Sequence, residues 1–152
     1  MSPPPTDDGG ETTGPPDRQT LRLLERILTD EPTVAATEFA PDTYEPRSLR
    51  ALLDAGRYPS TVNAARLDIR WFTTGDFAIH YIESRENDHH WECRWDRHPN
   101  SHNNRLHFHQ PPDGNNVEDI SLESVHPLDV LSTVLAAIEQ RVTEQWEAQS
   151  QG

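Results

Sequence analysis

The sequence predicts an α+β domain in which an antiparallel sheet of about four strands is packed by a long C-terminal helix, with short N-terminal helices before the sheet. Two observations support this fold class. From about residue 64, apolar and polar residues alternate with a period of two, which is typical of strands with one solvent-facing side. From residue 127, the apolar residues instead recur every three or four positions, which is typical of an amphipathic helix.

The first residues of the chain offer nothing that could pack into a core. Residues 1–17 consist mostly of Pro, Gly, Thr and Asp, and no apolar residue that could be buried follows Met1 in this stretch. Such a composition cannot bury enough surface to offset the entropy that is lost on ordering. We therefore expect residues 1–17 to form a disordered, acidic and proline-rich tail.

Residues 18–59 are expected to form an N-terminal helical segment. Apolar residues at a helical period predict a first helix over 18–29, for which Asp17 is a suitable N-cap. A proline-containing loop follows. A short second helix is then predicted over 47–55, with Gly56 as a suitable residue to end it.

Residues 60–148 are expected to form the sheet-plus-helix domain. Period-two alternation predicts four consecutive strands, over 64–71, 77–83, 91–96 and 105–109. The final helix begins at Pro127, and its apolar stripe comprises Leu128, Leu131, Leu135, Ile138, Val142 and Trp146. This helix should cover one face of the sheet and leave the other face to polar side chains.

The charge composition is typical of a protein adapted to high salt. The chain has 26 acidic residues against 13 basic ones, every basic residue is Arg, and the formal net charge is −13. At about 1 M salt the Debye length is only about 3 Å, so the repulsion among these carboxylates is largely screened. We therefore interpret the sequence as halophilic; the alternative, an ordinary acidic protein, is disfavoured by the absence of Lys.

The remaining composition indicates a cytoplasmic protein. Cys93 is the single cysteine, so the chain can form neither an internal disulfide nor a zinc cluster of several thiolates. No apolar run approaches the roughly 18 residues of a membrane span, and the N-terminus lacks the basic and apolar regions of a secretion signal. We expect no membrane association and no cofactor.

Histidines gather in the stretch of the chain that is not acidic. Residues 89–110 hold six of the eight His, together with three Arg and two acidic residues. If the apolar residues of the strands face the core, alternation places their polar neighbours on the opposite face. Those neighbours are His80, Arg94, Asp96, Arg105, His107 and His109, whereas His98 and His102 fall in the loop between the third and fourth strands.

Three interpretations of this polar surface remain open. The side chains could simply cover a solvated sheet face. Alternatively, His107 and His109, two positions apart on one strand, point the same way and could bind a metal; however, no HExxH motif or Cys pair supports a zinc site. The third interpretation is phosphoryl chemistry on RNA without a metal.

Metal-independent RNA cleavage needs an acid, a base and a group that binds the phosphate. One imidazole can take the proton from a ribose 2′-hydroxyl, and a second can protonate the departing 5′-oxygen. An Arg side chain can bind two phosphate oxygens at once. In this scheme His80 and either His107 or His109 are the acid/base pair, Arg94 binds the phosphate, and Asp96 fixes the tautomer of one imidazole.

The order of these motifs resembles the TumE family of toxins from toxin–antitoxin systems. The resemblance spans roughly residues 60–145 and is carried by three short runs, which are Phe77-Ala78-Ile79-His80-Tyr81, Arg94-Trp95-Asp96 before a proline-containing turn, and His107-Phe108-His109. Arg97 stands where the family motif has Asn, Asn100 and Ser101 stand where it has paired His, and His102 is a displaced candidate. The chain looks like a divergent, haloarchaeal-type member.

The resemblance implies a toxin that acts on RNA and is neutralised by a separate antitoxin protein. It also implies functional roles for His80, Arg94, Asp96, His107 and His109, with His102 as a further candidate. Endoribonuclease activity is the hypothesis that follows. A non-catalytic protein-interaction module and a His-rich metal-binding protein are the alternatives.

Overall fold

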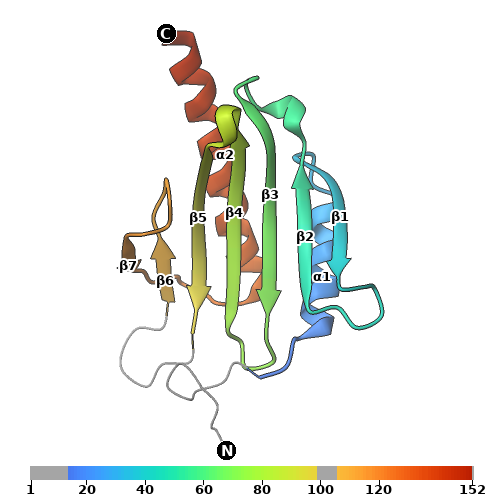
Figure 1. Cartoon of the computed structure of the whole chain (residues 1–152). Coiled ribbons are helices and arrows are strands. Elements are labelled where there is room, and N and C mark those ends of the chain that lie inside the picture. The colour runs from blue at the N-terminus through green and yellow to red at the C-terminus, as the bar shows by residue number, and fades with distance from the viewer. Residues whose placement is uncertain (1–13, 99–105, 152) are drawn as a thin grey trace, which may run out of the picture.

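The computed structural model describes residues 14–98 and 106–151, and its elements are labelled in Figure 1. There are two α-helices, α1 (Arg18–Thr29) and α2 (Pro127–Gln151), and two short 3-10 helices, η2 (Ala55–Arg57) and η3 (Glu86–Asp88). The strands are β1 (Val34–Ala40), β2 (Ser48–Leu53), β3 (Val62–Trp71), β4 (Phe77–Arg85), β5 (His90–Arg97), β6 (Leu106–His109) and β7 (Val117–Asp119).

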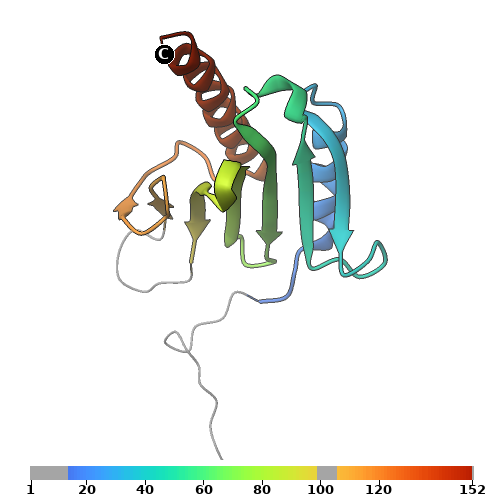
Figure 2. The same cartoon turned by 45° about the horizontal axis from the view of Figure 1, so that its top comes forward.

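The strands form one antiparallel sheet of seven strands, whose spatial order is their order along the chain. Both α-helices lie on the same face, with α1 behind β1 and β2 and α2 beside it behind the middle strands (Figures 1 and 2). We call this the covered face. Within the described residues the opposite face carries no helix, and we call it the open face. The predicted α+β class, antiparallel sheet and C-terminal helix are confirmed, but the predicted number of about four strands is wrong.

The structure has strand β2 where the sequence predicts a short helix over 47–55. Leu49, Leu52 and Leu53 fit a helical stripe, but Leu49, Ala51 and Leu53 also fit a period of two. The structure follows the period of two, because Leu49, Ala51 and Leu53 are buried, whereas Leu52 is 40% exposed. A short apolar run satisfies both periods, and pairing with β3, an interaction distant in sequence, decides between them. The edge strands β1 and β7 were likewise not expected.

The four predicted strands are present as β3, β4, β5 and β6, and their alternation is as expected. Most apolar residues of these strands point to the covered face, where they form the core with the apolar residues of both helices. Ala78 and Ile82 of β4 are exceptions, since they alternate with the core residues and face the open side. The buried strand residues include Leu67, Ile69, Trp71, Phe77, Ile79, Tyr81, Cys93, Trp95 and Leu106. Cys93 is buried among them, and burial raises the pKa of its thiol to about 12.

Helix α1 begins at the predicted cap. The carboxylate of Asp17 accepts hydrogen bonds from the backbone N and the Oγ1 of Thr20, at 3.1 and 2.9 Å, which satisfies one of the unpaired donors of the first turn. Its buried stripe is Leu21, Leu24 and Leu28. Residues 1–13 of the expected disordered tail lie outside the described residues, whereas residues 14–17 run beside the end of β3, where the backbone N of Asp17 donates to the carbonyl of Trp71.

Helix α2 begins at Pro127 as predicted, but its buried stripe differs from the predicted one. The residues buried against the sheet are Val130, Leu131, Val134, Ile138 and Val142, while Leu128 and Leu135 are only partly buried. Trp146 does not close the stripe, since it is 46% exposed and its indole N–H donates to the carbonyl of Arg57 at 2.8 Å. Among the described residues, no helix is long and apolar enough to cross a membrane.

A buried carboxylate joins α2 to the covered face. Glu83 of β4 has no exposed surface, and its two oxygens accept from the Nε and Nη2 of Arg141 on α2 at 2.9 and 3.0 Å. The Arg85 guanidinium and the Gln145 amide donate to the same carboxylate at 3.0 and 2.9 Å. We call these four residues the Glu83 cluster.

Two tyrosines and a tryptophan complete the surroundings of the Glu83 cluster. The hydroxyl of Tyr81 donates to Glu83 at 2.7 Å and lies 2.7 Å from the hydroxyl of Tyr58, whose pKa burial raises to about 12. The guanidinium of Arg141 lies 3.6 Å from the ring centroid of Trp91, at cation–π distance. Burial alone would raise the pKa of Glu83, but the hydrogen bonds from Arg141 and Tyr81 outweigh it, so its pKa is lower than usual.

Candidate functional site

The open face carries a row of ionisable side chains that crosses five strands. Arg50 of β2 is the direct partner of Asp68 on β3, which is the partner of His80 on β4. His80 is in turn the partner of Arg94 on β5, and Arg94 is the partner of His109 on β6. Directly opposed residues on one face have neighbouring side chains, so this register places the Arg94 guanidinium between two imidazoles.

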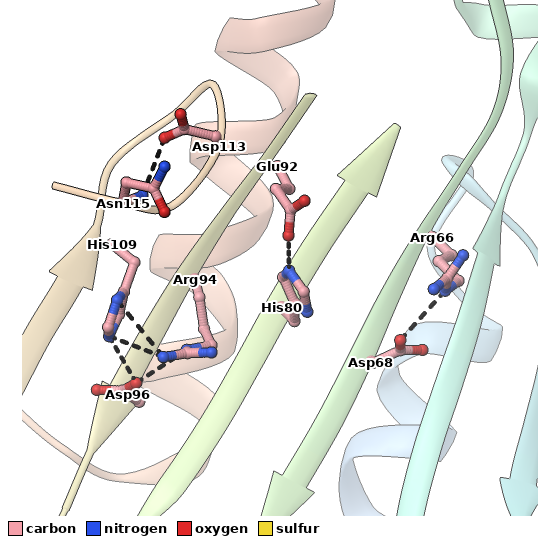
Figure 3. Close-up of polar contacts among 9 residues, drawn as sticks. All are labelled: Arg66, Asp68, His80, Glu92, Arg94, Asp96, His109, Asp113 and Asn115. Carbon is pink, nitrogen blue, oxygen red and sulfur yellow. Dashed lines mark hydrogen bonds and ion pairs between the residues drawn. The ribbon is translucent and has the colours of Figure 1, made fainter. Parts of the chain in front are cut away.

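A buried carboxylate organises the part of this row on β5 and β6 (Figure 3). Asp96 is 1% exposed, and its Oδ2 lies 3.0 Å from Nε of Arg94 and 3.0 Å from Nε2 of His109. Nε2 of His98 lies 3.3 Å from the same oxygen. Its other oxygen, Oδ1, is buried and accepts no hydrogen bond within the described part of the chain. We call Arg94, Asp96, His98 and His109 the Asp96 cluster.

The position of the carboxylate favours one tautomer of His109. Nε2 lies 3.0 Å from Asp96 and 3.1 Å from Nη2 of Arg94, so it can donate to the first or accept from the second, but not both. Facing a carboxylate, a protonated Nε2 is favoured because a bare lone pair there would repel the anion. Nδ1 of His109, 3.4 Å from Nη2 of Arg94, is then the nitrogen that can exchange a proton.

His80 has a carboxylate partner of its own. Its Nε2 lies 2.6 Å from Oε1 of Glu92, the next residue before Arg94 that faces the open side (Figure 3). Both side chains are about one third exposed. His80 and His109 thus share one feature, which is that Nε2 of each ring meets a carboxylate.

His107 lies on the open face in the row of opposed residues next to the row that contains Arg94 and His109. It is the register partner of Asp96 on one side and of Asp119 on the other. Its Nδ1 lies 3.2 Å from Oδ1 of Asp119 but without the geometry of a hydrogen bond, so this buried nitrogen has no hydrogen-bond partner among the described residues. His107 therefore faces the open side as predicted, next to the Asp96 cluster and with its ring 6.2 Å from that of His98.

The structure brings together the predicted site residues that lie within its described part. Arg94, Asp96 and His109 contact one another. His80 lies beside Arg94 on the neighbouring strand β4, and His107 lies beside Asp96 on β6. His102 and Arg105 lie outside the described residues.

Sequence reasoning missed two contributors to this site. Glu92 shares the alternation of Arg94 and Asp96, so the pattern already placed it on the open face. His98 comes directly after β5, and only the structure shows that its Nε2 lies 3.3 Å from the Asp96 carboxylate.

The geometry defines what this surface can do chemically. A guanidinium flanked by two imidazoles, each held by a carboxylate, can bind an anion and move protons on either side of it. In residues 14–98 and 106–151, no group of three or more His, Cys, Asp or Glu is arranged to hold a metal ion. The chain is therefore a small α+β protein with a histidine–arginine surface on the open face of its sheet.

Comparison with known families agrees with this class. The family model described as Toxin TumE matches residues 23–142, which is most of the chain, and the protein belongs to this toxin family. The match includes most of α1, all seven strands and most of α2. No curated protein and no solved structure gave a match.

Proposed function

We propose that this toxin is a metal-independent endoribonuclease whose site is centred on Arg94. The observation that carries the proposal is the register of β4, β5 and β6, which sets His80 and His109 on opposite sides of Arg94. With strands about 4.8 Å apart, the two histidine Cα atoms are roughly 10 Å from each other, so both imidazoles can reach the two sides of one bound phosphate.

The reaction is a transesterification within the RNA. One imidazole takes the proton of a 2′-hydroxyl as the 2′-oxygen bonds to phosphorus, and the other gives a proton to the 5′-oxygen as its bond to phosphorus breaks. The products are a 2′,3′-cyclic phosphate and a 5′-hydroxyl. The step consumes no water and requires no metal. Arg94 binds the phosphoryl oxygens, on which negative charge increases in the transition state.

The carboxylates make the imidazoles better suited to this work. Glu92 and Asp96 would stabilise the positive charge that each ring acquires when it is protonated, and they hold each ring by its Nε2, which leaves Nδ1 to exchange a proton with the substrate. Asp96 holds Arg94 as well, so one buried group orients both the phosphate ligand and one proton carrier. His107 is the neighbouring candidate for the acid/base role; His109 is favoured because it is the direct partner of Arg94.

Membership of a toxin family also supports a protein partner, a cognate antitoxin that keeps the activity in check. Since its target would be RNA, the toxin would act in the cytoplasm. The acidic, Lys-free composition leads us to expect the best activity at high salt.

The test is cleavage of a long single-stranded RNA by the purified chain at high salt in the presence of EDTA. The parent should produce 2′,3′-cyclic phosphate ends, and Arg94→Ala and His80→Ala should lose at least about 100-fold in rate. His89→Ala is the control, because His89 is exposed and follows η3, before β5 begins. Equal rates for the parent and for Arg94→Ala would refute the proposal.

A further inference from the structure

A second group of arginines surrounds a pocket at one end of the sheet. The pocket has a volume of about 370 Å³, and Arg18, Arg47 and Arg70 line it together with Ser48, Phe72 and one acidic residue, Glu45. The three arginines come from the start of α1, the residue before β2 and the end of β3. Figure 1 shows the start of α1 and the ends of β3 and β5 at the same end of the sheet.

Two of these arginines differ from their neighbours on the open face. Arg50 and Arg66 both pair with Asp68, at 2.8 and 3.1 Å, and Arg94 pairs with Asp96. Within the described residues, by contrast, neither Arg47 nor Arg70 forms an ion pair, and both side chains are exposed.

The pocket as a whole is therefore basic. Its one acidic residue, Glu45, lies 3.7 Å from Arg18, and both side chains are exposed, so this ion pair contributes little. In a chain with twice as many acidic as basic residues, unpaired arginines gathered around a hollow indicate a site for an anion.

One side of the pocket lies on the same surface as the Asp96 cluster. Arg70 alternates with the buried residues Ile69 and Trp71, so it belongs to the open face. Its register partner on β4 is Ala78, and the partner of Ala78 on β5 is Asp96. Arg70 is thus two strands, or about 10 Å, from Asp96, and the only side chain between them in that row is a methyl group.

We propose that this pocket is a phosphate-binding subsite for the RNA strand, holding a phosphate at least one nucleotide away from the bond that is cleaved. The inference rests on the proposed function, because it takes RNA as the substrate. The fork of an Arg side chain suits the oxygens of a phosphodiester, and the small Ala78 leaves the backbone of the RNA a path from Arg94 to Arg70. The subsite binds the strand without reading its sequence.

Binding can be tested separately from cleavage. The probe is a labelled 12-nucleotide single-stranded RNA in which every 2′-hydroxyl is methylated, so that it binds but is not cleaved. The variant Arg47→Gln/Arg70→Gln should bind it at least about tenfold more weakly than the parent. The slope of log K against log salt should fall by about 0.7 for each arginine removed. Arg26→Gln is the matched control, because Arg26 is exposed on α1, away from the open face.

Cleavage then distinguishes this inference from the proposed function. The dinucleotide UpA is long enough for the histidines but too short for the subsite, so the double variant should cleave it like the parent while its KM for a 12-nucleotide RNA rises about tenfold. Unchanged binding and unchanged KM for the longer RNA would overturn the subsite and leave the endoribonuclease proposal intact. Weakened binding by the double variant, with no cleavage by any protein, would support the subsite and refute the endoribonuclease. A parent that binds no RNA would overturn both.

Discussion

The two faces of the sheet each hold a carboxylate surrounded by arginine, yet the two clusters are built differently. On the covered face, Glu83 accepts from four side chains that share both of its oxygens, and Arg141 meets it with two parallel hydrogen bonds. On the open face, Arg94, His98 and His109 all approach a single oxygen of Asp96, and the other oxygen accepts nothing from the described residues.

This difference separates a cluster that supports the fold from one suited to chemistry. A buried charge with all its hydrogen bonds satisfied is held in one arrangement, and it ties α2 to β4. A buried carboxylate with competing donors can exchange partners as the protonation of a neighbouring imidazole changes. The Glu83 cluster should therefore govern stability, and the Asp96 cluster should govern activity.

The largest effect is expected from His109→Ala. Loss of one proton carrier should reduce RNA cleavage by about 10²- to 10⁴-fold, while the free energy of unfolding should change by less than about 1 kcal/mol because Arg94 still pairs with Asp96. Initial rates and urea denaturation measure the two quantities. A variant that loses activity only because it unfolds would contradict the separation of the two clusters.

The converse substitution, Glu83→Ala, should act on stability alone. It leaves Arg141 mostly buried without its partner, which should cost about 3–5 kcal/mol of unfolding free energy. Glu139→Ala is the control, since Glu139 pairs with Arg57 on the surface and should cost less than about 1 kcal/mol. Urea denaturation compares the two. Folded Glu83→Ala protein should keep the parent's rate of RNA cleavage.

The Glu83 cluster should also make the stability of the protein depend on pH in acid. The pKa of Glu83 is lower in the folded chain than its ordinary value of 4.5, so its contribution to stability is present above pH 4.5 and is lost as the pH falls through the lower, folded pKa. Glu83→Gln removes this titration, and its stability should fall less steeply with acid than that of the parent. Urea denaturation of both proteins between pH 7 and pH 3 tests this; parallel curves would refute it.

The smallest signal is expected from chemical labelling of the Cys93 thiol. Cys93 lies on the covered side of β5 between Glu92 and Arg94. Because burial raises its pKa to about 12, we expect almost no reaction with a thiol reagent at pH 8 in the folded protein, and rapid reaction in urea. Fast labelling of the native chain would mean that α2 detaches readily from the sheet.

The open-face surface could be predicted because it depends only on alternation. Leu67, Trp95 and Phe108 mark which residues face the core, and the polar residues between them follow. What alternation cannot supply is register, which decides that His80 opposes Arg94 and that Arg94 opposes His109.

The missed features depend on contacts between distant parts of the chain. The short run around Leu49 fits both a helix and a strand until β3 pairs with it. The Glu83 cluster could not be predicted either, since Arg141 and Gln145 come from a helix about 60 residues later, and nothing local to Glu83 indicates a buried partner.

The up-and-down order of the strands has a consequence for how the molecule is made. Each strand pairs with the one synthesised just before it, so the sheet can extend stepwise as the chain leaves the ribosome, without closing long loops. His80, Arg94 and His109 are added on three successive strands, and α2, the longer of the two helices on the covered face, comes last. A nascent chain that stops before residue 106 would have strands β1 to β5 but not His109, so under the proposed function it would lack one of the two imidazoles that RNA cleavage needs.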